Sequence, residues 1–65
     1  MKQQEIRSYI GKEVLIYVYG DEICYGTLQE FVKEDNREMI ELKGAFGTTY
    51  IPMKDVLYMI ERSRI

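Results

Sequence analysis

The sequence predicts a mainly β domain, in which a short N-terminal helix precedes five short strands that form one strongly bent sheet. Three observations predict this fold. Five runs rich in Val, Ile, Tyr, Leu and Phe follow one another, with turn residues between them. The second run is long and contains Gly26, and a glycine inside a strand marks a bulge, a sharp bend or a close backbone approach. The last two runs are joined by the very short segment Met53-Lys54-Asp55, which keeps their ends close together.

The predicted helix covers residues 2–10. Its apolar residues Ile6, Tyr9 and Ile10 have the spacing that places them on one helical face. Gly11 stands where a helix usually ends, in the left-handed conformation that glycine tolerates. Because a helix of about two turns is not stable alone, we expect this face to pack on the open end of the sheet.

The first two strands are predicted at residues 13–19 and 22–33, with Gly20-Asp21 as the turn between them. The first strand has no polar alternation, since its alternate residues are apolar on both sides. One side carries Val14, Ile16 and Val18, and the other carries Leu15, Tyr17 and Tyr19. A strand of this kind is covered on both faces. We expect the interior of the fold on one face and the helix or a partner on the other.

Three further strands are predicted at residues 38–43, 46–52 and 56–61. Asp35-Asn36 is the expected turn before the first of them, and Gly44-Ala45 the turn after it. Ile40 and Leu42 are expected to point inward, because they alternate with polar residues. Pro52 ends the fourth strand, since proline donates no ladder hydrogen bond. One helix and then five strands, with a bend in the second, is the order of a small SH3-like barrel, and we expect a single domain over residues 1–65.

Length and charge narrow the possible partners. With 65 residues the chain lies near the lower limit for a core that folds alone, so self-association is expected. The net charge of −2 argues against a strongly electrostatic hold on duplex DNA. No apolar run approaches the length of a membrane span, and the opening Met1-Lys2-Gln3 has no signal-peptide pattern. The chain is therefore expected to be cytoplasmic, without a membrane or duplex DNA as partner.

Catalysis has little support in the sequence. The chain contains no His, and its one cysteine, Cys24, lacks a basic partner and excludes an internal disulfide. The carboxylates are scattered, with no metal-ligand spacing. We predict a non-enzyme with no metal and no cofactor, in which Cys24 is a small buried hydrophobe.

Several segments resemble one known family. The run Ile16-Tyr17-Val18-Tyr19, the motif Gly26-Thr27-Leu28-Gln29-Glu30-Phe31 and the segment Thr48-Thr49-Tyr50-Ile51-Pro52 follow in the same order as in the Sm-like family. Within that family the chain is most similar to the bacterial Hfq RNA chaperones, which also begin with a helix. The likeness runs from Ile6 to Ile60. It departs at Val32, where the family usually has aspartate, and at Gly44-Ala45-Phe46, which replaces a lysine-histidine pair.

The resemblance implies a ring of six or seven copies, of bacterial or phage origin, that binds single-stranded RNA or nucleotides. In the family, strand four of one copy pairs with strand five of the next. The implied interface residues are Tyr50, Ile51, Val56, Tyr58 and Ile60. Tyr17 aligns with a base-stacking tyrosine, and Tyr25 is close enough in sequence to share its surface. The loop residues Lys33, Asn36 and Arg37 complete the implied RNA-binding set, with Asn36 on a base edge and the two cations on phosphate.

Other hypotheses remain open. Six tyrosines among 65 residues suit base stacking, which contributes about 1–3 kcal/mol per base, but tyrosine also fills barrel walls and interfaces. Two functions compete with RNA binding. One is an oligomeric, sponge-type binder of a small nucleotide-like ligand, which fits the acidic balance. The other is a protein-interaction or structural barrel that captures a peptide by strand addition.

Overall fold

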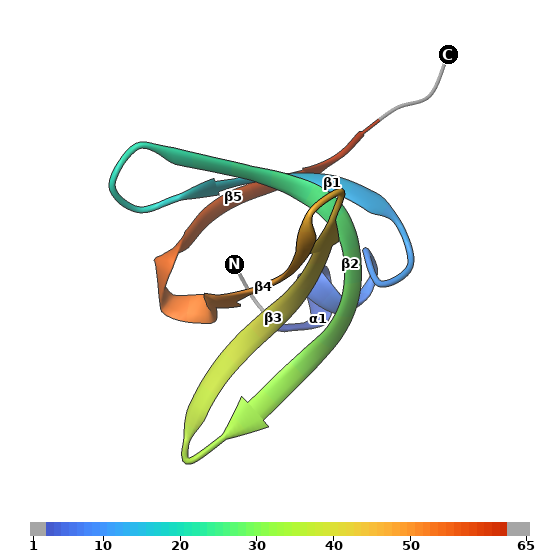
Figure 1. Cartoon of the computed structure of the whole chain (residues 1–65). Coiled ribbons are helices and arrows are strands. Elements are labelled where there is room, and N and C mark those ends of the chain that lie inside the picture. The colour runs from blue at the N-terminus through green and yellow to red at the C-terminus, as the bar shows by residue number, and fades with distance from the viewer. Residues whose placement is uncertain (1–2, 63–65) are drawn as a thin grey trace.

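The computed structural model describes residues 3–62. The elements are α1 (Gln3–Arg7), β1 (Glu13–Val18), β2 (Glu22–Glu34), β3 (Arg37–Gly44), β4 (Gly47–Pro52), the 3-10 turn η1 (Met53–Asp55) and β5 (Val56–Glu61). The five strands form one antiparallel sheet in the order β4-β3-β2-β1-β5, as Figure 1 shows. The predicted mainly β fold, with one short helix and five strands, is confirmed.

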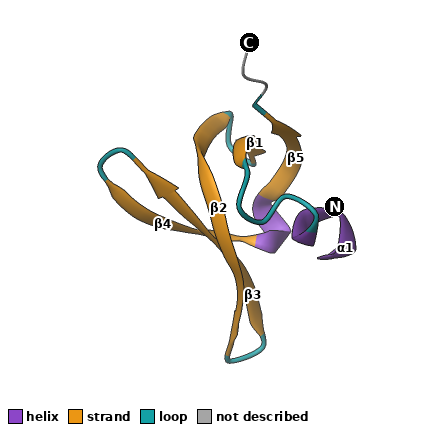
Figure 2. Cartoon of the chain, turned by 90° about the vertical axis from the view of Figure 1, so that its right-hand side faces the viewer, coloured by secondary structure: helices purple, strands orange, loops and turns teal. Residues whose placement is uncertain are grey.

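β2 is the strand that both halves of the sheet share. It pairs with β1 from Glu22 to Thr27 and with β3 from Thr27 to Glu34, so Thr27 belongs to both ladders. The ladder with β3 shifts between Leu28 and Glu30. Figure 2 shows β2 running between β4 on one side and β5 on the other. The predicted bend in this strand therefore lies where β2 changes partner.

Gly26 lies beside this change of partner. A Cβ atom placed on Gly26 would come within 2.5 Å of the backbone carbonyl oxygen of Lys43. Real Cβ atoms do not approach backbone so closely, so two segments of main chain meet here because one of them has no side chain. Of the three explanations that the sequence left open for this glycine, close backbone approach is confirmed.

The core lies on the inner side of the curled sheet. Its buried members come from α1 and from every strand: Ile6, Val14, Ile16, Val18, Leu28, Ile40, Leu42, Ile51, Val56 and Met59. The inward side predicted for the third strand, with Ile40 and Leu42, is confirmed, and of the two sides of the first strand the one with Val14, Ile16 and Val18 faces the core. Cys24 is half-buried and packs against the core from β2.

α1 is shorter than predicted, because it ends at Arg7 rather than at residue 10. Ile6 is fully buried and Tyr9 is half-buried, whereas Ile10 is exposed. After the helix, Gly11 adopts a φ of 87°, and its amide donates a hydrogen bond of 2.7 Å to the carbonyl of Leu28. That bond turns the chain toward β2 before another helical turn can form. Residue 2, the predicted helix start, lies outside the described residues.

Two of the three predicted turns are confirmed. Gly20-Asp21 and Asp35-Asn36 each have two positive φ angles in succession. The turn between β3 and β4 was predicted one residue too early. Gly44 pairs with Gly47, so Ala45 and Phe46 form the turn. Phe46 was expected to begin a strand, and it lies instead at the hairpin tip with its side chain fully exposed.

The sheet is open rather than closed. Within residues 3–62 no ladder joins β4 to β5, and these two strands are the edges of the sheet. The short 3-10 turn η1 connects them along the chain. No helix in the described part of the chain has the length and apolar character to cross a membrane.

Candidate functional site

The outer side of the β2-β1-β5 layer carries six apolar or aromatic side chains, which we call the aromatic face: Leu15, Tyr17, Ile23, Tyr25, Tyr58 and Ile60. They form two rows across the three strands. Tyr17 stands opposite Ile23 on β2 and Tyr58 on β5. Leu15 stands opposite Tyr25 on β2 and Ile60 on β5. Because side chains alternate along a strand, both rows point away from the core that Val14, Ile16 and Val18 help to form.

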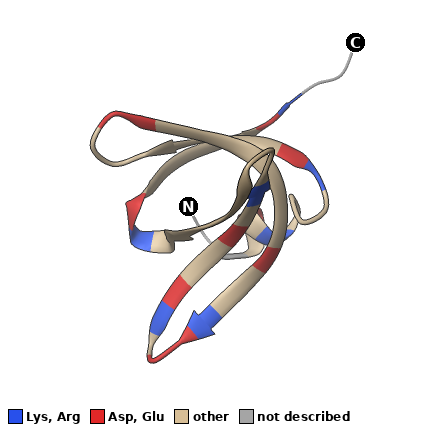
Figure 3. Ribbon diagram, viewed as in Figure 1, with Lys and Arg blue, Asp and Glu red and all other residues tan. Residues whose placement is uncertain are grey.

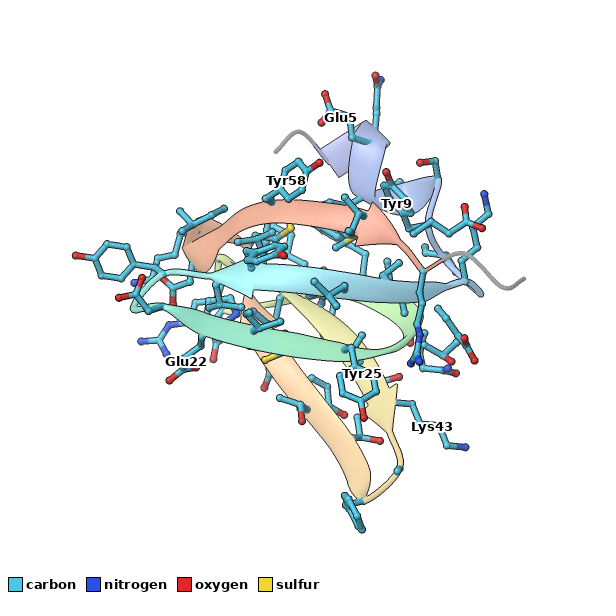
Figure 4. All side chains as sticks on the ribbon, turned by 90° about the horizontal axis from the view of Figure 1, so that it is seen from above. Glu5, Tyr9, Glu22, Tyr25, Lys43 and Tyr58 are labelled. Carbon is cyan, nitrogen blue, oxygen red and sulfur yellow. The ribbon has the colours of Figure 1, made fainter. Side chains whose placement is uncertain are left out.

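The aromatic face is open to solvent. Tyr25 is 62% exposed, Ile23 58% and Tyr58 54%, while Tyr17 and Ile60 are exposed to a smaller degree. Figure 4 views this layer from above, with Tyr58 on the β5 side and Tyr25 on the β2 side. In Figure 3 charged residues lie mainly toward the ends of these strands. Exposed apolar surface that gathers on one face is typical of interaction sites, so the aromatic face is a candidate site.

Two contacts order the tyrosines of this face. The rings of Tyr17 and Tyr58 lie with centroids 5.8 Å apart and planes tilted by 47°. The guanidinium carbon of Arg62 lies 5.5 Å from the ring centroid of Tyr25. Tyr17 and Tyr25 thus share one surface, as the sequence suggested, although they stand on the diagonal of the grid rather than opposite each other.

Sequence reasoning missed part of this surface. Tyr58 and Ile60 were assigned to an oligomer interface, and Leu15 and Ile23 were given no binding role. The sequence did indicate that the first strand has apolar residues on both sides. An apolar outer surface on this strand implied that the strands beside it would extend the same surface. Which strands lie beside the first one depends on strand pairing across the whole chain. This pairing cannot be read from the periodicity of apolar residues.

The predicted loop residues Lys33, Asn36 and Arg37 lie elsewhere, and only Asn36 is in a loop, because β2 extends past Lys33 and β3 begins at Arg37. They are close to the tip of the β2–β3 hairpin, which Figure 1 shows pointing away from β1 and β5. Lys33 stands opposite Glu38, and Arg37 stands opposite Glu34. Each cation therefore faces a carboxylate across the ladder, which weakens its field toward a phosphate. The hairpin residues Asn36 and Arg37 line an open groove of about 690 Å³ together with residues 38, 39, 52–54 and 56.

The predicted interface residues divide into two groups. The side chains of Ile51 and Val56 are buried in the core of the single chain. Tyr50, Tyr58 and Ile60 are exposed. The Tyr50 hydroxyl donates a hydrogen bond of 2.9 Å to Oε1 of Glu41, and this bond and the charge of that carboxylate raise the pKa of Tyr50 above its ordinary value. Tyr50 is thus held by β3 and stays accessible on β4.

The backbone of β5 offers a free edge. The Arg62 amide donates a hydrogen bond of 2.8 Å to the carbonyl of Glu13 on β1. Hydrogen-bonded pairs alternate along an antiparallel ladder. The backbone groups of Met59 and Glu61 therefore point away from β1. On β4, Pro52 occupies an edge strand, where its missing N–H removes no ladder bond.

Among residues 3–62, no three His, Cys, Asp or Glu side chains gather in a way that could hold a metal ion. Comparison with protein-family models, with curated proteins and with solved structures finds no match. Function must therefore be argued from the aromatic face, the two free edges and the cations around them.

Proposed function

We propose that this chain is a non-catalytic Sm-like protein whose copies assemble into a ring and bind single-stranded RNA or nucleotides on the aromatic face. The observation that carries the proposal is the exposure of Tyr17, Tyr25 and Tyr58 on one side of the sheet. Stacking of a base on an aromatic ring contributes about 1–3 kcal/mol and tolerates any base sequence. Three such rings on one surface suit a flexible strand of unpaired bases.

The strand order supports an Sm-like barrel. A short helix precedes the strands, β2 serves both halves of the sheet, and β4 and β5 are brought near each other along the chain by η1. A bent strand shared by two half-sheets is how a small barrel curls without a long connection. Strands β4 and β5 remain free to pair with other copies.

Two free edges support assembly. An unpaired strand edge is a template for pairing with another chain unless it is protected. Here one copy offers β4 and another offers β5, so a head-to-tail interface forms, which closes into a ring when the rotation per copy permits it. Six or seven copies are the sizes that the Sm-like resemblance implies. We expect this assembly to be cytoplasmic and non-enzymatic. Contacts between copies would bury additional apolar surface, which a 65-residue core lacks.

Binding to labelled RNA tests the aromatic face. Anisotropy of a fluorescein-labelled single-stranded RNA of mixed sequence gives the affinity of each variant. Tyr25→Ala should weaken binding about 5- to 150-fold, which corresponds to the loss of one stacked base. Tyr25→Phe should keep most of the affinity because the ring remains. Tyr19→Ala is the matched control, since Tyr19 is exposed and lies outside the aromatic face.

Native mass spectrometry of protein purified without nuclease treatment tests the assembly. A hexamer or heptamer that carries nucleotide mass supports both parts of the proposal. A ring that carries only a small nucleotide-like molecule would mean that this molecule, and not RNA, is the ligand. A ring without bound mass, together with no affinity for RNA, would favour a protein-interaction barrel. A monomer would refute the ring.

One variant separates assembly from folding. If Pro52 marks the side of β4 that faces away from β3, alternation directs the amide of Thr48 the same way. Thr48→Pro should therefore abolish the ring and leave the monomer folded, as judged by circular dichroism. Thr48→Val, which keeps the amide, should leave the ring intact.

A further inference from the structure

A groove of about 490 Å³ adjoins the aromatic face where the bend of β2 meets the β3–β4 hairpin. Its lining comes from three strands, the hairpin turn and the residue after β5: Glu13, Val14, Tyr25, Gly26, Thr27, Gln29, Lys43, Gly44, Ala45 and Arg62. Tyr25 belongs to both the groove and the aromatic face. A ligand that lies on the aromatic face at Tyr25 is therefore at the mouth of this groove.

Two cations line the groove from separate parts of the chain. Arg62 follows β5 and places its guanidinium carbon 5.5 Å from the centroid of the Tyr25 ring. Lys43 lies on β3, opposite Thr27 on one side and Thr48 on the other, so no carboxylate faces it across either ladder. Figure 4 shows the side chains of Tyr25 and Lys43 close to each other at this end of the layer. Glu13 is the one carboxylate of the lining.

The other cations within residues 3–62 are placed differently, and of these Lys54 lines the second groove. Lys12 forms an ion pair of 3.4 Å with Glu61, and Arg7 lies 5.5 Å from the ring centroid of Phe31. Lys33 and Arg37 each stand opposite a glutamate on the β2–β3 hairpin. The chain as a whole is slightly acidic, with a net charge of −2. Lys43 and Arg62 nevertheless place two positive charges in one groove beside the exposed tyrosines.

The close approach at Gly26 gives the groove its shape. Because Gly26 has no side chain, β2 meets the backbone of Lys43 directly. Thr27 and Gln29 add a hydroxyl and an amide to the lining, both able to donate to an anionic oxygen. Charged, hydroxyl and amide donors around one cavity are the usual partners of phosphate oxygens.

We propose that this groove is the phosphate subsite of the RNA-binding surface, in which Lys43 and Arg62 bind a phosphodiester next to the base that stacks at Tyr25. The inference rests on the proposed function and assigns its electrostatic part to residues outside the β2–β3 hairpin. Arg62 also fixes the Tyr25 ring from one side, so base and phosphate are bound by adjoining groups.

The salt dependence of RNA binding tests this subsite. For a single strand, the slope of log affinity against log salt is about −0.7 per phosphate neutralised. Lys43→Gln and Arg62→Gln should each make the slope shallower, and the double variant should make it shallower by about 0.7, the value for the one phosphate that the two cations share. The matched control is Lys54→Gln, because Lys54 is an exposed lysine that lines the other groove. Its slope should equal that of the unaltered chain.

Each outcome decides the proposal. Unchanged slopes in Lys43→Gln and Arg62→Gln would overturn the subsite and leave RNA binding by the aromatic face intact. An equal loss in Lys54→Gln would also overturn it, because the effect would then be one of net charge. No affinity of the unaltered chain for RNA would remove the proposed function together with this inference. The cation over the Tyr25 ring is Arg62. Lys43→Gln leaves that contact in place, so it remains decisive if Arg62→Gln fails to fold.

Discussion

The rings of Tyr17 and Tyr58 lie opposite each other across the β1–β5 ladder, 5.8 Å between centroids, on the solvent side of the sheet. The pair joins an interior strand to an edge strand. It therefore serves two purposes, since it stabilises β5 on β1 and presents two aromatic surfaces to solvent. Tilted aromatic pairs at such distances stabilise a fold by more than the burial of their surface area alone.

A double-mutant cycle measures this pair. Tyr17→Ala and Tyr58→Ala should show a coupling free energy of about 0.5–1.5 kcal/mol in chemical denaturation. The control cycle combines Tyr25→Ala with Tyr58→Ala, two residues on strands that β1 separates. Their effects should add. Additivity in the first cycle as well would mean that the ring contact contributes nothing to stability.

The two glycines of the groove give a matched test of backbone approach. Gly26→Ala should destabilise the fold by about 1–3 kcal/mol, because the new methyl group meets the Lys43 carbonyl and main chain has to move. At Gly44 the nearest atoms to a new Cβ lie 3.8 Å away, so Gly44→Ala should be tolerated. Thermal and urea unfolding of both variants check the difference. Equal stability of the two would contradict the close approach.

Two apolar residues at opposite extremes of burial test the extent of the core. Ile40 is fully buried, and Ile40→Ala should cost about 2–5 kcal/mol in free energy of unfolding. Phe46 is fully exposed at the β3–β4 turn, and Phe46→Ala should change that free energy by about 0.5 kcal/mol or less. A large loss of stability in dilute Phe46→Ala would indicate that Phe46 is covered in solution, for instance by another copy.

These positions also show how far sequence reasoning reaches. Strand positions, the inward side of β3 and the turn pairs Gly20-Asp21 and Asp35-Asn36 follow from periodicity and turn chemistry, which are local properties. The β3–β4 turn was misplaced because both Gly44 and Gly47 are turn formers, and only their pairing decides which residues lie between them. The helix was drawn too long because the bond from Gly11 to Leu28 that follows it is a tertiary contact.

The candidate site was harder to predict than the fold. Tyr17 was identified through the Sm-like resemblance, and Tyr25 was added because it lies in the strand next to that of Tyr17. The groove around Lys43 and Arg62 requires two further facts: that β5 pairs with β1, and that β2 changes partner at Thr27. Neither follows from residue spacing. Lys43 and Arg62 were therefore not among the predicted binding residues.

The hydrogen bond between Tyr50 and Glu41 predicts a pH effect with a defined sign. Because the Glu41 carboxylate raises the pKa of Tyr50 in the folded chain, the bond stabilises the fold below the unfolded tyrosine pKa of about 10. That stabilisation is lost as the pH rises through the folded value. In Glu41→Gln, Tyr50 should ionise at a lower pH, as measured by NMR of ¹³C-labelled tyrosine. Tyr50→Phe identifies the resonance. An unchanged midpoint would show that the bond is absent in solution.

The β1–β5 ladder has a consequence for how the chain folds. It is the one pairing in the described sheet between strands that do not follow each other in sequence, and it joins Val14 to Glu61. The hairpins β1–β2, β2–β3 and β3–β4 close over short loops, whereas this pairing closes a loop that spans most of the chain, and non-local contacts of this kind slow folding. During synthesis β1 leaves the ribosome first and must wait for β5, which leaves last. Until then β1 presents an unpaired edge, so the nascent chain is most open to mispairing before its final strand arrives.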